Sequence, residues 1–397
     1  MSTYHRCYSQ VVIFNDTGAI VRIIVLTSRY PSEDSPYSHM FVHTRSMQYL
    51  ASGCSVTVLI PAKHETKYVL DGISVVLAPV SKLASFIDTA DRIMIHLLYH
   101  RIDTDTDAGY LYDAVLKSKI PTLFFIHGVE TQTIWNSRRE DISWLSPKTI
   151  ARFVYRDFYL IKRMINTLKS FLDISFPCRF VAPSRWMLDE SYRHTGLDLS
   201  NKSLIIPNGI DTSHFEFRDL WNNRFNILSI RPLYLKGKYA IDLLLESYTY
   251  LPDSFQGCLY GKGPDEYLIQ QKINQLTNKK IKLIPKFLNQ NEIPRVHSLY
   301  GIYAAVTRMD AQGVSMCEAM ASGLPVVSYD TCAIPEFITH FDNGLLAKNY
   351  DAAQFYSYIE MLADDRKLFD KIASNARYSM EKIDIRKTTL RELSEDI

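Results

Sequence analysis

Residues 307–327 read TRMDAQGVSMCEAMASGLPVV, and this stretch does most to decide the fold. We interpret it as a strand end, a loop, a helix from about Gly313 to Ser322 that stops at Gly323, and a new strand. Because Gly313 lets backbone approach a ligand closely, the free amides of the first helical turn predict an anion site there. A phosphate group is the expected ligand.

Two acidic residues flank this predicted phosphate site. Asp310 precedes the helix and Glu318 lies inside it, eight residues further on. Their carboxylates are placed to accept hydrogen bonds from hydroxyl groups on either side of the phosphate. The alternative on physical grounds alone is an ordinary capped helix whose acids face solvent.

Short β-branched runs alternate with amphipathic segments over most of the chain, which is typical of parallel sheets covered by helices. The expected strands are 21–26, 56–60, 73–77, 92–95, 122–126, 179–181 and 204–206, and then 225–230, 257–260, 281–284, 302–306 and 325–328. Three helices are expected at the end, over 352–363, 366–382 and 385–397. We therefore predict an α/β protein with two doubly wound, Rossmann-like domains whose ligand crevices face each other across an interdomain cleft.

A chain of 397 residues with 47% apolar side chains is too long for one ordinary core, which also favours two domains. We expect an N-terminal extension of uncertain role over 1–20, an N-terminal domain over 21–211 and a C-terminal domain over 212–375. The helical segment 376–397 is expected to pack back on the N-terminal domain.

Composition excludes several classes of protein. Lysine and arginine number 45 against 43 acidic residues, so the balance does not suit a dedicated nucleic-acid binder. Six scattered cysteines, without a Cys-x-x-Cys pair, indicate neither a disulfide framework nor a metal site. No apolar run approaches the roughly 18 residues that span a bilayer, and no signal-peptide core is visible. We expect a cytoplasmic protein.

The stretch from Gly313 to Val327, which contains EAMASGLPVV, resembles the Glu-x7-Glu region of retaining glycosyltransferases of the GT-B fold, in particular glycosyltransferase family 4. The resemblance implies that Glu318 holds the ribose hydroxyls of a nucleotide and that Asp310 touches the donor sugar. It also implies that amides of Gly313, Val314 and Ser315 meet the diphosphate. The chain departs from the family in having Asp310 where glutamate is usual, which shortens the reach of that carboxylate.

Two cations follow the first strand of the second unit. Arg231 and Lys236 can reach one diphosphate from the same loop, the arginine as a fork and the lysine as a point charge. By the resemblance, they neutralise the leaving nucleoside diphosphate, so that no metal and no cofactor is required. The chain lacks an Asp-x-Asp motif of the metal-dependent type, and we interpret Asp103, Asp105 and Asp107 as the start of a helix.

Two further loops follow strands of the second unit. Gly261 and Gly263 permit a tight turn close to a ligand, and by the resemblance they lie beside the nucleotide. The segment with Lys286 and Phe287 resembles the one that frames the base, largely through backbone contacts.

In the first unit, a buried strand ends in His127-Gly128-Val129-Glu130. The resemblance implies that His127 contacts the donor sugar near its reacting carbon and that Glu130 neighbours the acceptor. Tyr37 and Ser38, in a first loop that lacks the family's usual glycines, are further acceptor-side candidates. His96 and His100 also follow a strand and are expected in the core or at the rim.

Residues 150–172 carry an apolar stripe at helical spacing, with basic and aromatic residues on other faces. Such a helix can rest on anionic lipid headgroups at the inner face of the membrane, although an ordinary packed helix is the simpler interpretation.

Together these features predict a retaining, metal-independent hexosyltransferase that moves a sugar from a nucleotide-diphosphate donor to a glycan or lipid-linked acceptor. By analogy it would serve surface polysaccharide or lipopolysaccharide biosynthesis. The alternatives are an inactive nucleotide-sugar-binding subunit and a GT-B sugar-nucleotide epimerase.

Overall fold

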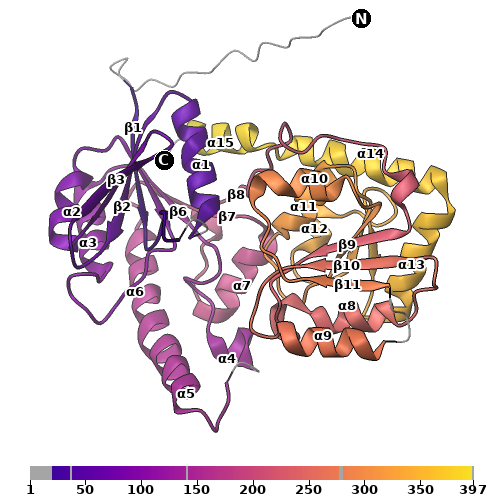
Figure 1. Cartoon of the computed structure of the whole chain (residues 1–397). Coiled ribbons are helices and arrows are strands. Elements are labelled where there is room, and N and C mark those ends of the chain that lie inside the picture. The colour runs from indigo at the N-terminus through magenta and orange to yellow at the C-terminus, as the bar shows by residue number, and fades with distance from the viewer. Residues whose placement is uncertain (1–19, 36–37, 140–141, 277–279, 396–397) are drawn as a thin grey trace, which may run out of the picture.

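A computed structural model describes residues 20–35, 38–139, 142–276 and 280–395, and shows two α/β domains side by side (Figure 1). The expected extension over 1–20 lies, except for Ile20, outside the described residues. Each domain is built on a largely parallel sheet, which confirms the predicted fold class.

The N-terminal sheet has eight strands in the order β3-β4-β2-β1-β5-β6-β7-β8. Its strands are β1 (Arg22–Thr27), β2 (Ser55–Pro61), β3 (Thr66–Leu70), β4 (Ile73–Ala78), β5 (Arg92–His96), β6 (Thr122–Phe125), β7 (Cys178–Ala182) and β8 (Ser203–Ile205). Only β3 is antiparallel to its neighbour, and it was not expected from the sequence. The strand order reverses between β1 and β5, which places a crevice at their carboxyl ends.

The C-terminal sheet has six strands in the order β11-β10-β9-β12-β13-β14. These are β9 (Asn226–Ile230), β10 (Gln256–Tyr260), β11 (Ile281–Ile284), β12 (Ile302–Ala305), β13 (Val326–Tyr329) and β14 (Leu345–Ala347). Here the order reverses between β9 and β12, so the loops that follow these two strands meet at one edge.

Helices cover both faces of each sheet (Figure 1). In the N-terminal domain these are α1 (Met40–Ala51), α2 (Val80–Ile87), α3 (Gly109–Ser118), α4 (Ile134–Ser137), α5 (Pro147–Val154), α6 (Ile161–Phe171) and α7 (Arg185–Thr195). After β9 come α8 (Ile241–Tyr248), α9 (Glu266–Gln275), α10 (Ile293–His297), α11 (Val314–Ala321), α12 (Ile334–Phe337), α13 (Ala352–Asp364), α14 (Arg366–Lys382) and α15 (Ile385–Ser394). None of the helices in the described part combines the length and the hydropathy that crossing a membrane requires.

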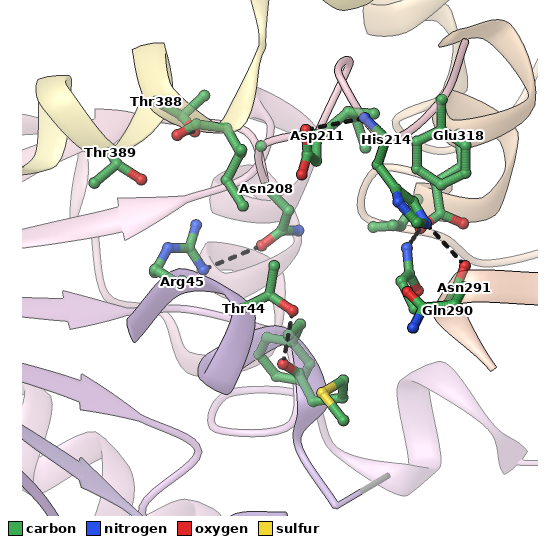
Figure 2. Close-up of a pocket in the computed structure, with 17 residues that line it drawn as sticks. Thr44, Arg45, Asn208, Asp211, His214, Gln290, Asn291, Glu318, Thr388 and Thr389 are labelled. Carbon is green, nitrogen blue, oxygen red and sulfur yellow. Dashed lines mark hydrogen bonds between the residues drawn. The ribbon is translucent and has the colours of Figure 1, made fainter. Parts of the chain in front are cut away.

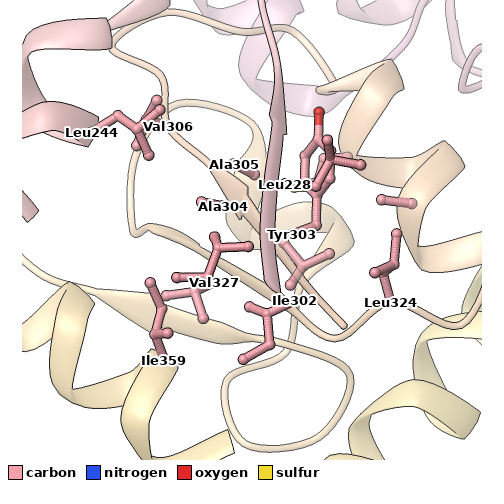
Figure 3. Close-up of a cluster of buried hydrophobic side chains, with 14 of the residues drawn as sticks. Leu228, Leu244, Ile302, Tyr303, Ala304, Ala305, Val306, Leu324, Val327 and Ile359 are labelled. Carbon is pink, nitrogen blue, oxygen red and sulfur yellow. The ribbon is translucent and has the colours of Figure 1, made fainter. Parts of the chain in front are cut away.

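The central strands are buried on both faces, as their continuous apolar runs predict. In β12 all four residues from Ile302 to Ala305 are buried, and Leu228 of β9 and Val327 of β13 pack beside them (Figure 3). This rigid core fixes where the strand-end loops emerge.

The last helix, α15, crosses from the C-terminal domain to the N-terminal domain and lies beside α1 (Figure 1). The Glu392 carboxylate, fully buried, accepts hydrogen bonds from Arg45 Nε at 2.9 Å and from the Tyr49 hydroxyl at 2.6 Å. A buried carboxylate that pairs with Arg45 and also accepts a hydrogen bond from Tyr49 resists separation, since either charge alone would be costly to bury. The pair therefore ties the end of the chain to the first domain.

Candidate functional site

The strand-order reversal of the second sheet brings Arg231 and Asp310 together. Arg231 follows β9, Asp310 lies in the loop after β12, and Arg231 Nη1 is 3.3 Å from Asp310 Oδ2. The arginine side chain is 5% exposed, yet its Nε and Nη2 have no hydrogen-bond partner among the described residues. Because a buried cationic donor without a partner is costly, this guanidinium is suited to an additional anion.

Asp310 also caps the predicted anion-binding helix. Its Oδ1 accepts hydrogen bonds from Gly313 N at 2.7 Å and from Gln312 N at 3.3 Å. Gly313 has φ +76°, a conformation that suits glycine, and it begins α11 as predicted. The Gly313 amide already donates to Asp310. The amides that remain for a ligand in the first turn of α11 are therefore those of Val314 and Ser315.

The loop that carries Arg231 is packed backbone to backbone against the loop of Gly261 and Gly263. A Cβ added at Gly261 would lie 1.9 Å from the Arg231 carbonyl oxygen, and one at Gly263 would lie 2.3 Å from that of Leu233. These glycines are therefore required by close approach of the two loops. Lys236, the second predicted cation, is exposed further along the same loop.

A pocket of about 340 Å³ lies between the two domains (Figure 2). It is lined by Met40, Phe41, Thr44 and Arg45 of α1, by Asn208, Gly209, Ile210, Asp211, His214 and Phe215 of the connecting segment, by Gln290, Asn291, Val314 and Glu318 of the C-terminal domain, and by Ile385, Thr388 and Thr389 of α15. Of the predicted site residues, Glu318 and Val314 are in this lining.

Glu318 is 8% exposed, and its Oε1 accepts a hydrogen bond from Gln290 Nε2 at 2.8 Å. Burial raises the pKa of Glu318 to about 7, although the Gln290 hydrogen bond opposes the shift. A buried carboxylate in the lining of a pocket is suited to bind a pair of hydroxyl groups.

The connecting segment is fixed to the loop after β12 by a reciprocal hydrogen bond. Gln312 Oε1 accepts from Asn208 N at 2.7 Å, and Gln312 Nε2 donates to Asn208 O at 2.8 Å. Our interpretation of the sequence assigned no role to Gln312 or Asn208. No local motif marks Arg45, His214 or Gln290 as pocket residues.

Lys286 and Phe287 lie after β11 but do not line the pocket. Lys286 forms an ion pair with Glu292, and the Phe287 side chain is half exposed. The pocket is reached a few residues later, at Gln290 and Asn291.

His127 follows β6, and its half-buried ring packs on Phe41, which lines the pocket, with 5.0 Å between ring centroids. His127 Nε2 is 3.0 Å from Nδ1 of the fully buried His96. Burial lowers the pKa of His127 to about 3 and that of His96 as well, so both rings are neutral near pH 7. His96 is a core residue, as expected, and it fixes one nitrogen of His127.

Of the three acceptor-side candidates, Glu130 is buried, Ser38 is partly exposed, and Tyr37 is not among the described residues. Glu130 is 1% exposed, its Oε2 accepts a hydrogen bond from His127 N at 3.0 Å, and burial raises its pKa to about 7. Ser38 lies two residues before Met40, and its hydroxyl contacts that of Ser35. Tyr37 lies outside the described residues.

The basic segment 150–172 is not one uniform helix. It consists of part of α5, a π-helical turn over Tyr155–Leu160 and α6. Arg156 is buried and donates to the carbonyl oxygens of Val129 and Gln132, and Arg163 pairs with Asp107 at 2.7 Å. Two of the basic residues of this segment, Arg156 and Arg163, are therefore engaged within the protein.

Asp107 has, besides Arg163, hydrogen bonds from the amides of Arg101 and Gly109, in agreement with its assignment to the start of a helix. Among the described residues, no three His, Cys, Asp or Glu side chains are grouped where they would hold a metal ion.

Comparison with known proteins matches residues 224–379 to the family model of Glycosyl transferases group 1. The chain is 30% identical over 181 residues to a probable sucrose-phosphate synthase of Thermosipho melanesiensis. The aligned stretch covers 41% of this chain and 42% of the relative. It is 30% identical over 155 residues to the amylovoran biosynthesis glycosyltransferase AmsK of Erwinia amylovora, covering 36% and 38%. The chain thus spans about two fifths of the length of the curated relatives that it matches.

Solved structures match over nearly the whole chain. Anabaena Alr3699/HepE in complex with UDP and glucose has a TM-score of 0.68 at 16% identity and covers 94% of this chain and 98% of its own. WaaG, a glycosyltransferase involved in lipopolysaccharide biosynthesis, has a TM-score of 0.61 at 13% identity, with coverages of 94% and 98%. The protein has the GT-B fold of these glycosyltransferases. The match to the Glycosyl transferases group 1 model lies almost entirely within the C-terminal domain of this fold.

Proposed function

We propose that the protein is a retaining, metal-independent glycosyltransferase that moves a hexose from a nucleotide-diphosphate donor to a glycan or lipid-linked acceptor in surface polysaccharide biosynthesis. The observation that carries the proposal is the buried Arg231 guanidinium, which has two unpartnered nitrogens and lies next to the start of α11. A diphosphate supplies the anion that such a group lacks.

In this proposal the nucleotide occupies the interdomain pocket, with its ribose hydroxyls on the Glu318 carboxylate. Arg231, Lys236 and the first-turn amides of α11 stabilise the negative charge that builds on the diphosphate as the bond to the sugar breaks. The acceptor oxygen attacks the anomeric carbon from the same face, and its proton passes to the departing phosphate. His127, whose Nε2 is engaged by His96, presents Nδ1 to the sugar.

Thermal unfolding in the presence of nucleoside diphosphates and their sugars tests donor binding, because a ligand that binds the folded state raises the midpoint by mass action. UDP and UDP-glucose are the first compounds to test, since structures of HepE were obtained with them. No stabilisation by any nucleotide would overturn the proposal.

Turnover separates the alternatives. An inactive binding subunit is stabilised by the donor without consuming it, and an epimerase releases nucleotide together with an epimerised sugar. A glycosyltransferase yields a glycoside, and the anomeric configuration of this product, measured by NMR, tests retention. The rate of its formation with and without EDTA tests metal independence.

Location at the inner face of a membrane, with residues 150–172 in contact with lipid, also belongs to this proposal. Arg156 donates to the Val129 carbonyl oxygen and Arg163 pairs with Asp107, so neither is available to lipid headgroups. The lipid contact would therefore come from the start of the segment and from the residues next to it.

A further inference from the structure

The first turn of α7, in the N-terminal domain, is capped by a residue of the C-terminal domain. Glu336, on α12, accepts a hydrogen bond from Arg185 N at 2.8 Å through Oε2 and one from Trp186 N at 2.7 Å through Oε1. The next amide, Met187 N, donates to the Ser184 hydroxyl at 3.2 Å. The amides of Arg185, Trp186 and Met187, which the helix itself leaves unpaired, thus all have acceptors, and two of these acceptors lie on the other domain.

A carboxylate is well suited to this position between α7 and α12 (Figure 1). The start of a helix carries partial positive charge, and hydrogen bonds to an ionised acceptor are stronger than those between neutral groups. Glu336 is exposed, so water can replace it when the two domains separate. The contact therefore favours this closed arrangement of the domains and still allows them to open.

Each end of the contact is joined to a loop of the candidate site. In the C-terminal domain, α12 directly follows Ala333, whose amide donates to the Asp310 carbonyl oxygen at 3.3 Å. In the N-terminal domain, Met187 of α7 packs against Gly128, since a Cβ added at this glycine would lie 3.3 Å from the methionine sulfur. The contact between α7 and α12 thus sets the separation between the loop of His127 and the loop of Asp310.

We propose that Glu336 is a positioning residue for sugar transfer, which holds the cleft closed on the donor by capping α7 across the domain boundary. This role rests on the proposed function, because it requires groups of both domains to act on one donor. Arg231 and Glu318, to which we assign the nucleotide, belong to the C-terminal domain, whereas His127, to which we assign the sugar, belongs to the N-terminal domain. Closure should therefore affect transfer more than it affects the binding of UDP alone.

Hydrogen exchange at the Arg185 and Trp186 amides tests the contact itself and needs no substrate. We expect both amides to exchange about tenfold more slowly in the wild type than in Glu336→Ala, because each donates to a charged acceptor. Small-angle X-ray scattering should show a larger radius of gyration for the unliganded variant, since its open form is more populated. Equal exchange in the two proteins, or equal radii of gyration, would overturn the proposal.

Steady-state kinetics test the consequence for transfer. Glu336→Ala should lower kcat/KM for the nucleotide sugar at least about threefold, because the fraction of closed protein falls, and should change UDP affinity by less than about twofold. Glu336→Gln keeps one acceptor oxygen and should lie between the wild type and the alanine variant.

Asp365→Ala is the matched control. Asp365 is also an exposed carboxylate of the C-terminal domain, and it accepts the amides of Lys367 and Leu368 at the start of α14 in the same domain. Its replacement should lower stability but leave the radius of gyration and kcat/KM unchanged.

The measurements separate failure of this inference from failure of the proposed function. A fall in UDP affinity that matches the fall in kcat/KM would overturn the inference, because Glu336 would then act on the nucleotide site and not on closure. Protected α7 amides in a wild type that transfers no sugar would reject the proposed function, while still supporting closure of the cleft by Glu336.

Discussion

Replacement of Arg231 by methionine shows whether this arginine serves to bind a ligand or to stabilise the fold. The ion pair between Arg231 and Asp310 is long, at 3.3 Å, and Asp310 is a quarter exposed. Replacing Arg231 by an apolar side chain of similar length should change the free energy of unfolding by no more than about 1 kcal/mol. The ion pair is lost, but the cost of burying the arginine charge is lost with it.

Binding of a nucleoside diphosphate should respond much more strongly. Nε and Nη2 of Arg231 are unpartnered, and two hydrogen bonds between a charged donor and a phosphate are worth about 3 kcal/mol or more. We therefore expect isothermal titration with UDP to show an affinity about 100-fold lower for Arg231→Met.

Arg224→Met provides the contrasting control. The Arg224 guanidinium packs on the Trp221 ring at 4.4 Å and donates to the Ala363 carbonyl oxygen. This variant should lose about 1–2 kcal/mol of stability in urea unfolding and keep wild-type UDP affinity. An Arg231→Met protein that binds UDP within about twofold of wild type would refute the assignment of its guanidinium to the diphosphate.

Changes at three further residues, Glu318, His127 and Glu392, have expected outcomes. Because burial raises the pKa of Glu318 to about 7, stability should fall as pH rises from the ordinary glutamate range through 7; Glu318→Gln should flatten that slope in unfolding measured across pH. Affinity for a nucleotide sugar should instead rise as pH increases through 7, because the ionised Glu318 carboxylate accepts from the ribose hydroxyls and the diphosphate of such a donor loses no proton in this range. The rise should be absent in Glu318→Gln. A wild-type affinity that does not change with pH would argue against ribose binding by this carboxylate. His127→Ala should lower kcat about 100-fold with little change in donor affinity, and an unchanged kcat would remove His127 from the reaction. Glu392→Gln should cost about 3 kcal/mol, because the buried Arg45 charge loses its partner, whereas Arg45→Met/Glu392→Leu should recover most of the loss; a single variant of wild-type stability would show that α15 is anchored by other contacts.

The sequence was sufficient for most of the fold, because apolar runs flanked by amphipathic segments dictate parallel strands. It did not reveal β3, whose alternating exposed residues Thr66–Leu70 form an edge strand, or β14, which has only three residues. β3 lacks the continuous apolar run that marks a strand buried on two faces, and the buried apolar run of β14, Leu345–Ala347, is too short to indicate a strand. Strand edges are therefore the part of this fold that pattern alone predicts least well.

Proximity of Arg231 and Asp310 was predictable, because each follows a strand at the point where strand order reverses. The other half of the pocket was not predictable. Arg45, Gln290 and Thr388 enter the pocket from three elements whose relative position depends on how α15 binds the first domain. Such tertiary arrangement leaves no local signal in the sequence.

The central claim is that Arg231 and Glu318 together hold a nucleoside diphosphate in the cleft, and a structure with bound UDP tests it most directly. The account predicts phosphate oxygens within hydrogen-bond distance of Arg231 Nε and Nη2, and ribose hydroxyls on the Glu318 carboxylate. A nucleotide bound elsewhere, or one bound in the cleft with the Arg231 guanidinium still unpartnered, would contradict it.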